Sequence, residues 1–182
     1  YLKKIPLGRF GEVREVALTC CDWVRFSISG VTDEMYAAVQ RPIADRYDLK
    51  GVVQNVKEFI RRKKEQNSKV EIGMTYLIIP EPSNYKDLSR AAEFAYKTGF
   101  DFFAVRTDMG NIVRKFNNEE MNEILRQIGM IEENTKQGKY GKMKIDLRGV
   151  RAEELEAKEI DPEMQRAENC YARFMKMVIN PY

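Results

Sequence analysis

Val70-Glu-Ile-Gly-Met-Thr-Tyr-Leu-Ile-Ile79 is an apolar run that stops at Pro80, and this stretch decides the fold. A similar run at residues 22–29 precedes it and ends in hydroxyls, and a third at residues 100–106 follows it. Segments with helical periodicity join the runs, as in right-handed crossovers between parallel strands. The sequence therefore predicts an α/β fold, either half of an α/β barrel or an open doubly wound sheet. In such sheets functional residues gather where the strands end.

Three segments have the apolar spacing of helices. The first begins near Val52 and ends in the basic stretch 61–64, which we interpret as a solvated helix end. The second starts at Asp87 and stops at Gly99. A third is capped by an asparagine, has four apolar residues facing inward and stops at a glycine: Asn118; Met121, Ile124, Leu125 and Ile128; Gly129. Further along, alternating Met143, Ile145 and Leu147 predict a short strand.

Composition excludes several classes of protein. Lys and Arg number 31 against 28 acidic residues, a formal charge of +3, which is too small a surplus to indicate a nucleic-acid partner. No apolar run approaches membrane-spanning length and no signal peptide is visible, so we expect a cytoplasmic protein without a membrane partner. The chain contains no histidine, which removes Ser-His and Cys-His dyads and His-ligated zinc from this stretch.

One junction is unusual. Residues 13–19 have the composition of a buried strand, and the run that begins at Asp22 follows after only Cys20 and Cys21. A two-residue hairpin favours Gly or Asn, and parallel neighbours need a dozen or more linking residues. We therefore hypothesise that the chain skips a stretch between Cys20 and Cys21. An intact mass well above 21.3 kDa would support this hypothesis.

Several of these stretches resemble a known family. Residues 22–30 with Tyr36 and Arg41, residues 72–80 with Asn84, and residues 100–106 are similar to the later strands of the radical S-adenosylmethionine (SAM) barrel. The resemblance is greatest to the branch with an auxiliary iron-sulfur domain of the SPASM or twitch kind. It implies a partial (β/α)6 TIM-like barrel that holds a 4Fe-4S cluster on a CxxxCxxC loop, with SAM on the open iron.

The CxxxCxxC motif is absent from this sequence. Residues 12–20 resemble the family's first strand leading into that loop, so the resemblance makes Cys20 a remnant of the ligand loop. The hypothesised skip would then contain the second and third strands and the other cluster ligands.

The resemblance also implies cofactor-binding residues at the ends of the strands. Ser27 corresponds to a hydroxyl near SAM, and Arg41 corresponds to an arginine on the SAM carboxylate, a role that suits its planar fork. Asn84 and Arg106 would complete the SAM site. The alternatives are a serine bonded to backbone, a surface arginine, and loop or strand termini without a ligand.

The C-terminal residues 167–182 resemble the start of a SPASM or twitch domain. Cys170 would then be a ligand of an auxiliary iron-sulfur cluster, and the alternative is a buried thiol. We accordingly divide the chain into a radical SAM partial barrel at residues 1–133 and, at residues 134–182, a linker with the start of the auxiliary domain.

The resulting expectation is a radical SAM enzyme that forms a 5′-deoxyadenosyl radical and abstracts hydrogen from a peptide, sugar or aminocyclitol. Its electron donor would be flavodoxin or ferredoxin. Two alternatives keep the α/β barrel: a cluster-free enzyme acting on a small molecule, and a degenerate barrel that serves as a binding module.

Overall fold

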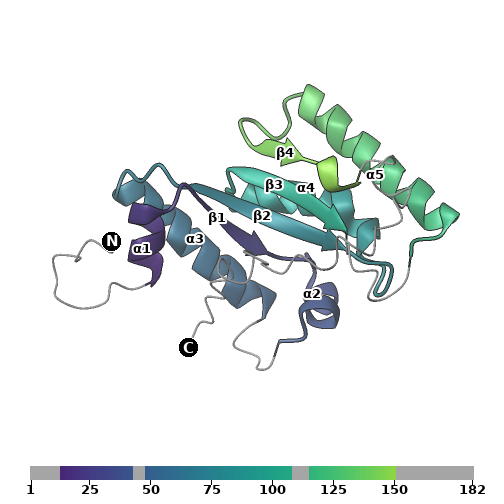
Figure 1. Ribbon diagram of the computed structural model, residues 1–182, viewed down its shortest axis with the longest axis horizontal. Coiled ribbons are helices and arrows are strands. Elements are labelled where there is room, and N and C mark those ends of the chain that lie inside the picture. The colour runs from purple at the N-terminus through teal and green to yellow at the C-terminus, as the bar shows by residue number, and fades with distance from the viewer. Residues whose placement is uncertain (1–12, 43–47, 108–114, 151–182) are drawn as a thin grey trace, which may run out of the picture. The chain divides into compact units, whose positions relative to one another are not determined.

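The computed structural model describes residues 13–42, 48–107 and 115–150 (Figure 1). Four strands form one parallel sheet in the order β1-β2-β3-β4. Their bounds are β1 Trp23–Ser27, β2 Glu71–Ile78, β3 Phe102–Thr107 and β4 Lys144–Asp146. The predicted α/β class and the strands predicted from the apolar runs are confirmed.

The helices connect the strands in chain order. They are α1 Val13–Cys20, α2 Asp33–Gln40, α3 Leu49–Glu65, α4 Leu88–Thr98 and α5 Asn118–Lys136, with short 3-10 turns η2 Asn84–Asp87 and η3 Arg148–Val150. Because strand order follows chain order and every pair is parallel, each crossover moves one place in the same direction. This is the winding of α/β barrels and also of one half of a doubly wound sheet, which reverses its order only at its switch point.

The apolar core lies between the sheet and its helices. Phe26, Met74, Phe103 and Ile145 are register partners on successive strands and share one face of the sheet. The Phe26 ring lies edge-on to Phe59 of α3, with centroids 5.9 Å apart. This face is therefore the one that α3 covers, and the alternate residues of each strand point to the opposite face.

Two helix ends follow from local sequence. Gly99 ends α4 in the left-handed conformation with φ 97°, as the sequence predicts. The cap of α5 is Asn117 rather than the predicted Asn118, because Asn117 and Glu120 bond each other's backbone amides in a capping box. The predicted stop at Gly129 is wrong, since α5 continues to Lys136, and Leu125 is 41% exposed rather than inward.

The strand predicted at residues 13–19 is wrong, because this segment is helix α1. Its Ala17 and Leu18 are buried, and the Ser68 hydroxyl before β2 donates to the Leu18 carbonyl. A helix can pass to a strand through a link of two residues. The steric reason for a skipped stretch at Cys20 and Cys21 is therefore removed.

Within the described residues the sheet is open, with β1 and β4 at its edges, so closure into a partial barrel remains a prediction. These residues belong to one compact unit that ends at Val150. The division at residues 133 and 134 also stays a prediction, and Cys170 lies outside the described residues. In the part of the chain that the structure describes, every helix is too short or too polar to cross a membrane.

Candidate functional site

Four small or polar residues form a row across the sheet face opposite α3. Ser27, Thr75, Ala104 and Asp146 are register partners on β1, β2, β3 and β4, and we call them the carboxyl row. They alternate with the core residues. Ser27 and Asp146 end β1 and β4 at the carboxyl edge of the sheet, and Thr75 and Ala104 each lie three residues before the ends of β2 and β3. Because functional sites of parallel α/β sheets gather at this edge, the row is the candidate site.

The hydroxyl of Thr75 is a special feature of this row. Its Oγ1 is buried and has no hydrogen-bond partner among the described residues. Buried polar groups are nearly always paired, and an unpaired one calls for an explanation such as a ligand. Ser27, its register neighbour on β1, is exposed. The two hydroxyls are thus adjacent, one open to solvent and one covered.

Ser27 and Arg41 are brought together by helix α2. The Thr32 side chain caps this helix by accepting from the Met35 amide. At the other end, Gln40 Nε2 donates to the Ser27 carbonyl at 2.9 Å, which fastens the last residue of α2 to the last residue of β1. Arg41 follows in the left-handed conformation with φ 46° and is exposed. The two predicted SAM contacts therefore start from adjoining backbone segments.

Asn84 lies inside the protein, with 0% of its surface exposed. Its Nδ2 donates to the carbonyls of Ser29 and Leu77, each at 2.8 Å, and its Oδ1 accepts from the Ile79 amide at 2.8 Å. Its own carbonyl accepts from the Tyr76 hydroxyl at 2.9 Å. These contacts favour the alternative given for Asn84, a loop residue without a ligand, which here fastens the end of β1 to the end of β2.

Arg106 is held by the protein at the end of β3. Its guanidinium donates to Asp146 Oδ2 at 2.8 Å and to the Val105 carbonyl at 2.7 Å. Asp146 also accepts from Arg148 Nε at 2.9 Å. Hydrogen bonds from Arg148 and Arg106 hold the pKa of the Asp146 carboxyl well below its usual range. Arg106 therefore takes part in an Arg–Asp–Arg cluster that borders the carboxyl row.

Cys20 lies at the opposite edge of the sheet. It is the last residue of α1, just before β1 begins, whereas Ser27 ends β1. Figure 1 shows α1 and α2 at opposite ends of this strand. Across residues 13–42, 48–107 and 115–150, no group of three or more Cys, Asp or Glu side chains is placed to hold a metal ion. The structure thus does not bring Cys20 together with the predicted SAM-binding residues.

Sequence reasoning missed Ser29, Thr75 and Asp146. The Ser29 hydroxyl accepts from the Leu77 amide at 3.1 Å and so supports the same strand ends as Asn84. Thr75 lies within the apolar run of residues 70–79, and Asp146 lies between the alternating Ile145 and Leu147; both side chains point away from the face that α3 covers. The alternation of residues along each strand was the signal that could have found them.

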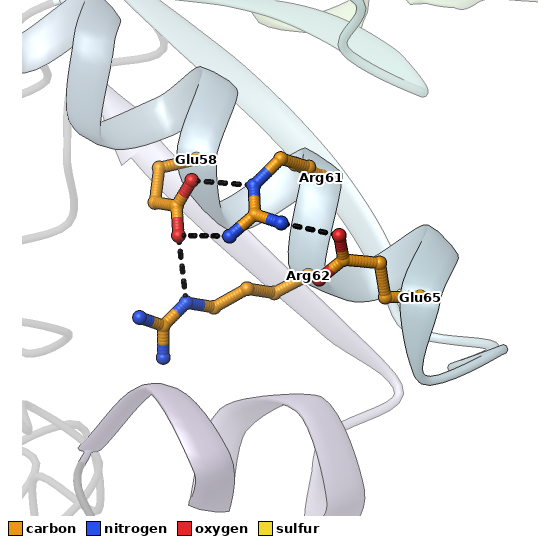
Figure 2. A network of polar contacts seen from close by, with 4 residues as sticks. All are labelled: Glu58, Arg61, Arg62 and Glu65. Atoms are coloured by element: carbon orange, nitrogen blue, oxygen red, sulfur yellow. Dashed lines mark hydrogen bonds and ion pairs between the residues drawn. The ribbon is translucent and has the colours of Figure 1, made fainter.

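The densest charge network lies elsewhere, on the outer face of α3 (Figure 2). Glu58 accepts from Arg61 at 2.7 Å and from Arg62 at 2.9 Å, and Arg61 also contacts Glu65. These hydrogen bonds lower the pKa of Glu58 to about 2. In the basic stretch predicted to be a solvated helix end, Arg61 and Arg62 are thus matched by acidic neighbours on their own helix. Lys63 donates to Asp101, just before β3, at 2.6 Å, and we assign the stretch no ligand.

No family model matches this chain, and no curated protein matches it.

Proposed function

We propose that this chain is the later part of a radical SAM partial barrel and that SAM binds at the carboxyl row. The same proposal includes a (β/α)6 TIM-like architecture, a cytoplasmic location and a flavodoxin or ferredoxin as electron donor. The substrate class, a peptide or a sugar or aminocyclitol, also belongs to the proposal. It rests on the resemblance of the strand sequences together with the winding of the sheet.

The hydrogen bond from Gln40 to the Ser27 carbonyl is the single observation that carries this proposal. It fastens the end of α2 to the end of β1, so that Ser27 and Arg41 stand at one rim. The unpaired Thr75 hydroxyl beside Ser27 supports the same location, because a bound ligand would supply the missing partner.

Each residue has a definite chemical task in this proposal. The guanidinium of Arg41 offers two parallel N–H donors to the methionyl carboxylate of SAM, a pairing that a lysine cannot reproduce. The hydroxyls of Ser27 and Thr75 bond ribose or carboxylate oxygens. Asn84 and Ser29 do not touch SAM and instead hold the strand ends that carry Ser27 in place.

The described residues do not fit the 4Fe-4S cluster of this family. Such a cluster needs several thiolates at one point. Cys20 lies at the amino end of β1, away from Ser27, and in the three described ranges no group of metal ligands gathers. Under the proposal, the cluster ligands belong to other parts of the full-length protein.

Isothermal titration calorimetry of the protein with SAM tests the role of Arg41. Loss of a charge-assisted hydrogen bond costs about 1.5–3 kcal/mol, so Arg41→Ala should weaken SAM binding roughly tenfold or more. Arg90→Ala, an exposed arginine on α4, is the matched control and should leave the affinity unchanged. Equal affinities for the wild type and Arg41→Ala would contradict the assignment.

The position of Cys20 favours a second candidate function, a cluster-free α/β protein that binds or converts a small molecule at the same row. Anaerobic reconstitution of the full-length protein with iron and sulfide separates the two. Cluster absorbance with reductive cleavage of SAM supports the radical SAM proposal. An intact full-length chain that takes up no iron supports the cluster-free candidate.

A further inference from the structure

The link between α1 and β1 presents two neighbouring thiols. Cys20 ends α1, Cys21 follows outside any helix or strand, and both are free and exposed. The link is anchored on both sides: Ser68 bonds the Leu18 carbonyl of α1, and the Asp22 carbonyl accepts from the Glu71 amide at 2.9 Å. The two thiols are therefore held at the amino edge of the sheet, open to solvent.

The surroundings limit what these thiols could bind. The chain has no histidine, and among the described residues no third ligand joins them in a metal-binding group. Structural zinc requires four ligands, so a zinc site does not fit. Two thiolates suit a soft, thiophilic centre of low coordination number. The side-chain neighbour of Cys20 Sγ is the neutral Thr19 hydroxyl, 3.4 Å away.

We propose that Cys20 and Cys21 form a vicinal dithiol site that chelates trivalent arsenic compounds. With phenylarsine oxide, both S–H bonds break and two S–As bonds form. The oxygen of the arsenical leaves as water with the two thiol protons. Arsenic stays trivalent, so the step needs no oxidant or reductant. This site lies at the other end of β1 from the carboxyl row. It requires Cys20 and Cys21 to be neighbours in the natural protein, whereas the radical SAM resemblance places a skipped stretch between them.

Chelation makes a specific prediction about competing thiols. A single S–As bond exchanges with any free monothiol, whereas a chelate reforms because its second thiol is held nearby. Linked binding groups of this kind gain on the order of 10²–10⁴ in apparent affinity. The arsenical should therefore remain on Cys20 and Cys21 in excess glutathione and leave when a small dithiol is added.

The experiment uses the reduced 182-residue chain carrying Cys170→Ser, which removes the third cysteine of this sequence. It is mixed with one equivalent of phenylarsine oxide and excess glutathione, and intact mass spectrometry counts the adduct. We expect one phenylarsenic group per chain, released by 2,3-dimercaptopropanol. Adding Cys20→Ser or Cys21→Ser should weaken retention on the order of 100-fold, and circular dichroism checks that these variants stay folded.

Two results would overturn the proposal. One is an adduct that glutathione removes as readily from the parent as from the single-cysteine variants. The other is peptide mapping of the natural protein that finds further residues between Cys20 and Cys21, since the two thiols would then not be neighbours.

Discussion

Asn84 illustrates how one buried amide organises the rim of the sheet. Its side chain makes three hydrogen bonds, all to backbone groups of the segments that end β1 and β2. Nothing in the local sequence specifies those partners, because the Ser29 carbonyl lies 55 residues away along the chain. The amide thereby joins the backbone that follows β1 to the backbone at the end of β2.

Asn84→Ala should therefore destabilise the protein. Removing the amide leaves buried donors and acceptors unpaired at a cost of about 1–3 kcal/mol each, partly relieved by relaxation. We expect the free energy of unfolding to fall by about 2–4 kcal/mol in urea titrations. Asn122→Ala, on the exposed side of α5, should change it by less than about 0.5 kcal/mol. A small effect at Asn84 with a large loss of SAM affinity would instead make Asn84 a ligand.

The Asp146 carboxylate should make stability depend on pH. Its pKa is depressed in the folded state by Arg148 and Arg106, so its ion pairs stabilise the fold above the unfolded pKa of about 3.9. That contribution disappears as pH falls through the lower, folded pKa. At neutral pH the free energy of unfolding of the wild type should exceed that of Asp146→Asn by about 0.5–1 kcal/mol, the usual contribution of partly exposed ion pairs. This difference should shrink in acid.

Carboxyl NMR titration measures this directly. The pKa of Asp146 should lie below its usual range in the wild type and rise toward it in Arg148→Ala, since Arg148 is the main cause of the shift. An ordinary pKa in the wild type, unaltered by Arg148→Ala, would disprove the assigned pairing.

At the scale of elements, β2 and β3 fit together through Gly73. A Cβ built at this position would lie 2.0 Å from the Phe102 ring, its neighbour in the register. Gly73→Ala should displace that ring and cost about 1–3 kcal/mol, as overpacking does. The matched control is Gly129→Ala in α5, where an added Cβ would meet nothing within 4 Å beyond the local helix backbone.

The two glycine variants should change the stability of the protein in opposite directions. Alanine suits a helix interior better than glycine by about 0.8–1 kcal/mol, so Gly129→Ala should raise the melting temperature while Gly73→Ala lowers it. Equal effects of the two variants in thermal denaturation would contradict the packing of Phe102 on Gly73.

The strands could be predicted from the sequence because apolar runs and apolar alternation carry a strong signal, but the helix at residues 13–20 and the end of α5 could not. Residues 13–20 are too few to separate a period of two from a period of 3.6, and tertiary contacts of Ala17 and Leu18 favour the helix. Gly129 did not end α5, because the burial of Ile131 beyond it favours continuation.

The candidate site was predictable to the same limited extent. Ser27 could be identified as a strand-end hydroxyl, because this needs only the position of the apolar run and the alternation of residues along it. The partners of Asn84 and the pairing of Arg106 with Asp146 depend on which strands are neighbours. That information is not local, so the sequence indicated the edge of the sheet but not the division between ligand-binding and structural residues.

At the scale of the whole molecule, the two edges of the sheet carry different kinds of reactive or polar side chains. The carboxyl edge carries Ser27 and Arg41, with Thr75 beside Ser27 in the middle of β2, and the amino edge carries the two neighbouring thiols. A sheet wound in one direction leaves β1 and β4 as edges in the described part of the chain. A partial barrel would extend from those edges, and its SAM site would use the face opposite α3.

NMR chemical-shift mapping with SAM tests the central claim most directly. We predict saturable changes in the backbone amide signals of Ser27, Arg41 and Thr75, with the amides of Cys20 and Cys21 unaffected. An absence of saturable changes, or changes confined to the amino edge, would contradict a SAM site at the carboxyl row.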